Sequence, residues 1–452
     1  MASKTEIIDG ILQKFIDNGC SPKTVTEIRP TLLEIVENFK DQTPSESIEE
    51  IIVNLEEATK NFLNEKNDKG ISLIYGIASS VYAYGKNDED WTLLFHGGKT
   101  NYDTEQEVTE HTKFDVASIT KLYTLVLKDK LVESGYFKDS DKIVDLLPEF
   151  INMEDFTLED LSLLCGELRT NGRLDSAPNR IKALEMLKEI YLHSNDRTVN
   201  KYSDFGAIIT ALAIESRFNA LNDTTYDFAK ILQEMIFNNY SMSSTIFNPS
   251  EKDIVSGNGS LDNIVHDPKT RILGGISGAA GLFTTTLDQA KFAKALFAGN
   301  NPDYDFINDP VSPENIKKYG TVTFPNSPQS NKGHFGLYVK NPDPAKFFCP
   351  QDYSNGTFVH QGWTGAYTVF DPTNEVHNSI FVGALRPDLV KQYKEQEDFK
   401  EYISNDKPTG FMSGFHTYQD AITKNTLIIK ALKEYLSMCY EESEMLIRVK
   451  VR

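Results

Sequence analysis

Apolar residues recur at helical spacing through the first part of the chain. Such a pattern covers positions 7–16, resumes over 31–40 and returns over 51–62. The polar run 67–70 is a plausible end to this region. We therefore expect a helical N-terminal extension over residues 1–67.

The pattern then becomes typical of β-strands. Residues 71–84 are rich in Ile, Val, Tyr and Ser, and after a polar turn the apolar character continues over 91–95. Near the other end of the chain, 358–370 and 377–385 are apolar runs joined by Asp-Pro-Thr-Asn-Glu. We predict two β-hairpins, with 358–370 as a single strand.

The sequence between these hairpins is mostly helical. A helical pattern covers 117–135, others lie within 136–271, and a glycine-rich run precedes one near 287–298. Another amphipathic segment, 426–440, follows the last strand. Strands at both ends with helices between them indicate an α+β fold, and short turns indicate antiparallel pairing.

The chain's length and charge restrict its function. Its 452 residues carry 46 Lys+Arg against 66 Asp+Glu, a net charge of −20 that disfavours nucleic acid and membrane surfaces as partners. We see no secretory signal pattern and no apolar run of about 18 residues. The four cysteines are widely spaced and show no zinc pattern. These features predict a cytoplasmic protein without a metal or cofactor.

Ser118 and Lys121 form the sharpest chemical signal. They are three residues apart where a helix is predicted to begin, so both side chains share one helix face. A neutral, desolvated lysine can take a serine's proton, and N–H groups at a helix start favour a developing oxyanion. The alternative is a capping serine and a solvated lysine. A second Ser-x-x-Lys, Ser404 to Lys407, is polar and runs into proline.

Two further residues are candidates for this chemistry. Tyr202 precedes an apolar helix and could relay a proton, although a buried structural tyrosine is the commoner case. His360 lies on the predicted strand before Gly362, where it could polarise a substrate group, and its alternative is a surface histidine.

These motifs occur in the order found in a known family. The chain resembles the β-lactamase-related serine hydrolases, which include class C β-lactamases, low-molecular-mass penicillin-binding proteins and class VIII-type esterases. The resemblance covers roughly residues 71–390 and rests on Ser118-Ile-Thr-Lys121, Tyr202-Ser-Asp204, the segment 265–283 and His360-Gln-Gly362.

The resemblance implies the β-lactamase/transpeptidase-like fold, with an antiparallel sheet flanked by helices. Residues 68–135 and 272–452 would form the catalytic domain, and 136–271 an inserted all-helical domain. The N-terminal helices of 1–67 lie outside the resemblance. We expect them to pack on the catalytic body or to mediate homo-oligomer formation.

The resemblance also implies roles for individual residues. Ser118 would be acylated, Lys121 would be its base, and Tyr202 would assist proton transfer to the leaving group. The backbone N–H groups of Ser118 and Trp363 would form the oxyanion hole. His360 would bind or polarise the substrate, and the remaining substrate-binding positions would be Asp204, Gly362, Trp363 and Thr364.

Two departures from the family pattern bear on the substrate. Asp204 replaces the usual asparagine and would repel anions, and His360 replaces the lysine that pairs with a β-lactam carboxylate. Both favour a serine hydrolase of small esters or amides, esterase-like in activity. A D-amino-acid peptidase or β-lactamase acting on cell-wall-derived compounds, a transacylase, and a degenerate binding protein remain as alternatives.

Overall fold

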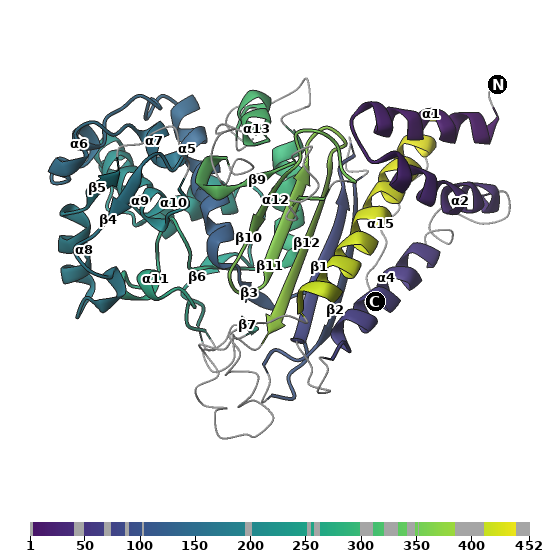
Figure 1. The fold of residues 1–452 in the computed structure, drawn as a ribbon, viewed down its shortest axis with the longest axis horizontal. Helices are drawn as coiled ribbons and strands as arrows, with labels where there is room; N and C mark the ends of the chain where they lie inside the picture. Colours follow the sequence, from purple (N-terminus) through teal and green to yellow (C-terminus); the bar gives the residue numbers. More distant parts are fainter. Residues whose placement is uncertain are drawn as a thin grey trace.

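The computed structural model describes most of the chain (Figure 1). The described residues are 3–39, 49–66, 74–85, 90–101, 104–194, 201–250, 255–256, 263–298, 311–320, 333–340, 349–350, 352–384 and 411–439. The predicted boundary at residues 67–68 lies outside them. In this part of the chain, no helix has both the length and the apolar character needed to cross a membrane.

A six-stranded sheet forms the centre of the molecule, and all its neighbouring strands are antiparallel. Its order is β2–β1–β12–β11–β10–β9, so the first strand pairs with the last. The strands are β1 (Ile74–Ala83), β2 (Trp91–Gly98), β9 (Tyr338–Val339), β10 (Phe358–Gln361), β11 (Ala366–Asp371) and β12 (Val376–Ala384). This arrangement confirms the predicted fold class.

The prediction of one strand over 358–370 is wrong. The segment forms two strands, β10 and β11, joined by a tight turn in which the N–H of Gly362 donates to the carbonyl of Ala366 at 2.7 Å. Gly365 has a φ of 98°, a conformation that glycine adopts without strain. The glycines therefore reverse the chain where the apolar pattern alone indicated continuity.

Both faces of the sheet are covered. Along β1, Ala78 and Tyr82 belong to the core shared with α5 (Thr120–Glu133) and α12 (Thr286–Ala298). The alternate residues Ile77 and Val81 belong to the core on the other face, beneath α15 (Phe411–Cys439). A strand buried on both faces reads as continuously apolar, as β1 does.

The N-terminal extension joins α15 on that second face (Figure 1). It forms α1 (Lys4–Asp17), α2 (Pro22–Asn38) and α4 (Glu49–Leu63), and serines at positions 3 and 21 cap the first two helices. The second helix begins nine residues earlier than predicted, because Ser21 and Pro22 form a helix start and Pro30 is accommodated inside. The extension therefore packs against α15 and the main sheet.

The insertion lies at the far edge of the sheet, beyond β9 and β10 (Figure 1). It is mainly helical and also contains a two-stranded sheet of β4 (Glu167–Arg169) and β5 (Tyr191–Ser194). Its helical elements are α6 (Ile143–Leu146), η3 (Ile151–Met153), α7 (Leu158–Ser162), η4 (Leu174–Ser176), α8 (Arg180–Lys188), α9 (Asp204–Asn222), α10 (Phe228–Leu232), η5 (Gln233–Phe237) and α11 (Pro268–Ile272).

A small sheet connects the insertion to the catalytic domain. Its order is β6–β8–β3–β7, comprising β3 (Lys113–Asp115), β6 (Ile246–Phe247), β7 (Val255–Ser256) and β8 (Leu282–Thr284). The remaining elements are η2 (Ala117–Ile119), α13 (Pro313–Tyr319) and η6 (His334–Gly336). Because β3 leads into η2, this sheet fixes where Ser118 lies.

Candidate active site

Ser118 lies in η2, a short turn that leads directly into α5. Ala117 has a φ of 43°, in the left-handed region that residues other than glycine rarely adopt. The Asp115 carboxylate supports this turn by accepting hydrogen bonds from the N–H of Ala117 at 2.8 Å and of His266 at 2.7 Å. Burial raises the pKa of Asp115 to about 6. Local strain is therefore held in place directly before the predicted nucleophile.

Lys121 lies one turn into the same helical segment and is completely buried. Its Nζ donates to Ser118 Oγ at 3.0 Å, to Asp204 Oδ1 at 2.7 Å and to the carbonyl of Ala279 at 3.0 Å. The structure thus brings together the serine and lysine that their spacing predicted, and the ammonium group has three oxygen partners.

Asp204, at the first position of α9, lies between two lysines. Its second oxygen accepts from Lys269 Nζ at 2.7 Å, and Lys269 is partly exposed. Burial alone would raise the pKa of Asp204, but Lys121 and Lys269 hold it well below its usual range. Burial would likewise lower the pKa of Lys121, but Asp204 and Tyr202 raise it above its ordinary value.

This cluster changes the expectation about charge. An unpaired Asp204 would repel anionic substrates, whereas the observed set contains one carboxylate and two ammonium groups. With all three ionised, as their pKa directions indicate, the cluster carries a net positive charge. The argument that Asp204 disfavours anionic substrates therefore does not hold.

Tyr202 lies beside Lys121, as the sequence predicted for a proton relay. The Lys121 Nζ is 5.0 Å from the centre of the Tyr202 ring, and Tyr202 helps to raise the pKa of Lys121. Tyr202 is 36% exposed, so it also faces solvent. Its ring lies against Gly336 of η6, where a Cβ atom would be 2.3 Å from two ring carbons.

The turn between β10 and β11 lies against the segment that carries the nucleophile. A Cβ atom on Gly362 would be 2.3 Å from the carbonyl oxygen of Val116, so only glycine permits this approach. Thr364 is buried, and its hydroxyl donates to the carbonyl of Asp115 at 2.5 Å. This hydrogen bond gives Thr364 a positioning role where a substrate contact was predicted.

The same close approach bears on the predicted oxyanion hole. Trp363, between Gly362 and Thr364, belongs to the turn that contacts the nucleophile segment, and its side chain is 68% exposed. The backbone N–H groups of Ser118 and Trp363 therefore belong to neighbouring segments. Their joint role in binding an oxyanion remains a prediction.

His360 is placed differently from the expectation. Only 2% of it is exposed, and its ring nitrogens face two backbone carbonyl oxygens, that of Gln361 at 3.0 Å and that of Phe335 at 3.2 Å. The predicted contact with substrate is not supported, because η6 covers the ring. The geometry assigns His360 to holding η6 against β10.

The sequence reasoning missed three members of the site: Lys269, Ala279 and Asp115. Lys269 and Ala279 both fall in 265–283, the segment that the family resemblance had singled out without giving its residues a role. That signal could have directed attention to a lysine next to His-Asp-Pro. Asp115 had no comparable signal in the sequence, because the strain at Ala117 that it supports is visible only in the structure.

The comparison with known families decides what this arrangement is. The Beta-lactamase family model matches residues 75–392, which is most of the chain. The chain belongs to the β-lactamase family. It is therefore a member of a serine hydrolase family, and the assignment of Ser118 as the nucleophile remains a prediction.

Relatives of this β-lactamase-family chain include two enterobacterial proteins, each named as a candidate D-alanyl-D-alanine carboxypeptidase. The Escherichia coli K12 protein is 25% identical over 330 residues, which is 62% of this chain and 70% of the relative. The Salmonella gallinarum protein is 25% identical over 361 residues, which is 69% of this chain and 76% of the relative.

Solved structures show that the β-lactamase fold is shared. A mutant class C β-lactamase superposes with a TM-score of 0.57 at 14% identity, covering 80% of this chain and 97% of its own. An octameric penicillin-binding protein homologue from Pyrococcus abyssi gives 0.51 at 17% identity, covering 75% and 73%.

Proposed function

We propose that this chain hydrolyses small esters or amides through an acyl-enzyme formed on Ser118. The observation that carries the proposal is the 3.0 Å contact between Ser118 Oγ and the fully buried Lys121 Nζ, which itself contacts Asp204. A buried ammonium group has a large desolvation cost, and the cluster meets that cost at the position where a nucleophilic serine needs a proton acceptor.

The proposed reaction proceeds in two steps. Lys121 first passes a proton to Asp204, and Ser118 Oγ then attacks the substrate carbonyl and gives its proton to Lys121. The negative oxygen of the tetrahedral intermediate is bound by the N–H groups of Ser118 and Trp363. Tyr202 delivers a proton to the departing alcohol or amine. Tyr202, now a phenolate, takes a proton from the water molecule that attacks the acyl-serine and releases the acid. Asp204 returns its proton through Lys121 to Ser118 Oγ.

A second candidate is removal of a D-amino acid from the carboxyl end of a peptide. The observation that favours it is Lys269, which gives the Lys121–Asp204 cluster its net positive charge and is exposed enough to face a substrate. A positive site attracts a substrate carboxylate. The names of the E. coli and Salmonella relatives are consistent with this second candidate.

Intact-mass labelling tests the acyl-enzyme. The wild type, Ser118→Ala and a control, Ser216→Ala, whose hydroxyl donates to Leu146 in the insertion, would each be treated with a fluorophosphonate, p-nitrophenyl acetate and penicillin G. We expect one adduct per chain in the wild type and control and none in Ser118→Ala. No Ser118-dependent adduct with any reagent would contradict catalysis and favour a binding protein.

Turnover distinguishes the substrate classes. Release of p-nitrophenol without cleavage of a peptide ending in D-alanyl-D-alanine would favour the esterase. Release of D-alanine would favour the carboxypeptidase. Acyl transfer to added hydroxylamine in preference to water would indicate a transacylase.

A further inference from the structure

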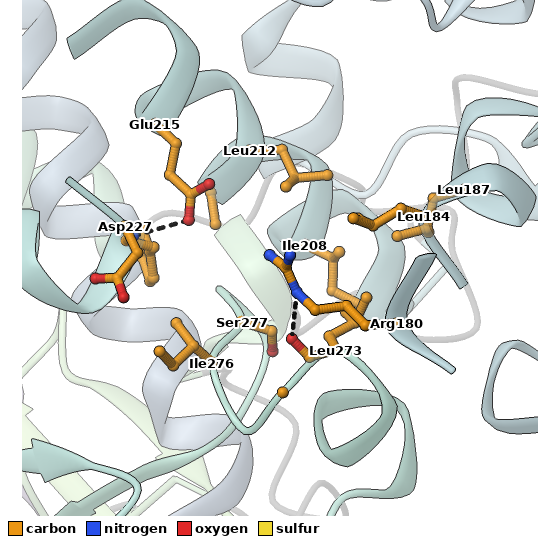
Figure 2. Close-up of a pocket in the computed structure, with 13 residues that line it drawn as sticks. Arg180, Leu184, Leu187, Ile208, Leu212, Glu215, Asp227, Leu273, Ile276 and Ser277 are labelled. Atoms are coloured by element: carbon orange, nitrogen blue, oxygen red, sulfur yellow. Dashed lines mark hydrogen bonds between the residues drawn. The ribbon is translucent and has the colours of Figure 1, made fainter. Parts of the chain in front are cut away.

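A cavity lies within the insertion, away from Ser118. It has a volume of about 420 Å³ and lies between α8, α9, the start of α10 and the segment after α11 (Figure 2). Most of its wall is apolar, and Leu187, Ile208 and Phe228 are each at most 2% exposed. Its size falls in the range of small-molecule sites.

One cation, Arg180, and two carboxylates, Glu215 and Asp227, line this apolar space. The Asp227 carboxylate caps α10 by accepting from the N–H of Lys230 at 2.8 Å, so Glu215 is the carboxylate left for a ligand. Arg180 donates from Nε to the carbonyl of Leu273 at 2.9 Å, and its guanidinium end reaches into the middle of the lining residues (Figure 2). Glu215, on α9, accepts from the N–H of Phe228 at 2.8 Å. Burial and the charge of Asp227 raise the pKa of Glu215, and the hydrogen bond from Phe228 and the charge of Arg180 partly offset this effect.

Arg180 and Glu215 act on each other only through space. Within the described residues, the two side chains form no ion pair with each other. Arg180 donates to the carbonyl of Leu273 from Nε, and its two terminal nitrogens make no hydrogen bond to the described residues. Because the two opposite charges share the cavity without contacting each other, each can still bind an oppositely charged group of a ligand. A ligand with a negative group, a positive group and an apolar part would meet all three requirements.

We propose that this cavity binds a free α-amino acid with a bulky apolar side chain. Arg180 would bind the carboxylate, since the planar guanidinium matches carboxylate geometry. Glu215 would bind the ammonium group. The side chain would lie among Leu187, Ile208 and Phe228. The inference is independent of the reaction proposed for Ser118.

An adjacent hollow borders this cavity. It has a volume of about 520 Å³ and shares Arg180, Leu184, Leu212 and Glu215 with the inner cavity. Its outer wall includes Glu149 and Lys188, whose side chains are 44% and 47% exposed. Arg180 and Glu215 therefore lie where the cavity meets this hollow.

The cavity is distinct from the catalytic centre but shares a segment with it. Leu273 to Ser277 form one wall of the cavity, and the chain then continues to Ala279, whose carbonyl accepts from Lys121. Neither Ser118 nor Tyr202 lines the cavity. A ligand here would therefore contact the back of the segment that holds Lys121, and it would not need Ser118 to bind.

Isothermal titration of the full chain tests the site with four probes: L-phenylalanine, D-phenylalanine, 3-phenylpropanoate, which lacks the ammonium group, and 2-phenylethylamine, which lacks the carboxylate. We expect one enantiomer to bind at one site per chain, because three contacts around one carbon distinguish enantiomers. Each truncated probe should bind at least tenfold more weakly than that enantiomer.

Variants assign each contact. Arg180→Met should weaken phenylalanine at least tenfold and leave 2-phenylethylamine unchanged. Glu215→Gln keeps an acceptor for Phe228, and it should weaken phenylalanine similarly while leaving 3-phenylpropanoate unchanged. If Arg180→Met does not fold, Glu215→Gln alone decides the test.

Two controls should bind the better enantiomer as the wild type does. The first is Arg217→Met, which matches Arg180→Met because Arg217 Nε also donates to a backbone carbonyl, that of Tyr136 at 3.0 Å, yet lies outside the cavity. The second is Ser118→Ala. The proposal is overturned if no probe binds at millimolar concentration, if the two enantiomers bind equally, or if binding survives Glu215→Gln.

Discussion

At the residue scale, the substitution of aspartate for asparagine at position 204 has the largest consequence. Asp204 stabilises the charged form of Lys121 against the effect of burial. A lysine that stays protonated donates to Ser118 and cannot accept its proton. The proposed mechanism therefore requires a neutral Lys121, which a proton transfer from Lys121 to Asp204 would produce.

This arrangement predicts a pH profile. In the wild type, kcat/KM for p-nitrophenyl acetate should keep rising through the alkaline range, because the pKa of Lys121 is raised and its neutral form increases with pH. In Asp204→Asn the carboxylate is gone and burial lowers that pKa, so kcat/KM should level off at a lower pH.

Lys269→Gln provides the opposite control. The charge of Lys269 disfavours a protonated Lys121, so removing it should raise the pKa of Lys121 further. The rise of kcat/KM should therefore move to higher pH. A rise that moves to lower pH in Lys269→Gln, or that does not move in Asp204→Asn, would exclude Lys121 as the titrating group.

Gly336 offers a second test at this scale. It has a φ of 83°, and a Cβ there would overlap the Tyr202 ring. Gly172 has a φ of 86° and no atom within 4 Å of the equivalent position. Alanine at either position should cost about 1–2 kcal/mol in backbone strain.

Only Gly336→Ala should also displace Tyr202. We expect its kcat for p-nitrophenyl acetate to fall at least about tenfold, since a positioned proton donor contributes about 10²- to 10⁴-fold. The kcat of Gly172→Ala should stay near wild type. Equal losses of kcat in the two variants, compared at temperatures below both thermal midpoints, would remove Tyr202 from the mechanism.

At the scale of elements, the N-terminal helices contribute apolar area to the core beneath α15. Leu32, on α2, is fully buried there, whereas Val53, on α4, is 57% exposed. Leu32→Ala should lower the free energy of unfolding by about 2–5 kcal/mol, and Val53→Ala by less than about 0.5 kcal/mol. Urea denaturation measures both.

Activity per labelled Ser118 should stay unchanged in both variants, because the helices lie on the face of the sheet away from the site. If Leu32→Ala changed stability no more than Val53→Ala, the extension would not be part of the core. Self-association through these helices remains a prediction. Light scattering on the full chain and on Val53→Asp, which alters only an exposed side, would test it.

The same scale shows what the sequence could predict. Ser118 and Lys121 could be paired because three residues of helix fix their geometry. Lys269 could not be paired with Asp204, because that contact joins positions 65 residues apart and depends on how α11 packs against α9. Likewise, nothing local to His360 indicates that Phe335, 25 residues away, covers its ring.

At the scale of the whole molecule, the resemblance predicted the architecture because its motifs are spread over most of the chain. The prediction failed where backbone geometry outweighs apolar pattern, as in the glycine turn that separates β10 from β11. Net charge is a weaker guide at this scale. A chain with a net charge of −20 still places two lysines around one carboxylate at its reactive centre.

The pairing of β1 with β12 sets the order of events during synthesis. Ser80 and Ser379, whose hydroxyls are 2.9 Å apart across these strands, are separated by 299 positions. The ribosome must therefore deliver nearly the whole chain before the middle of the sheet can close, and until then β1 exposes an apolar edge to aggregation. In the proposed mechanism Ser118 becomes reactive only when distant segments meet, so the rate of fluorophosphonate labelling during refolding would time that closure.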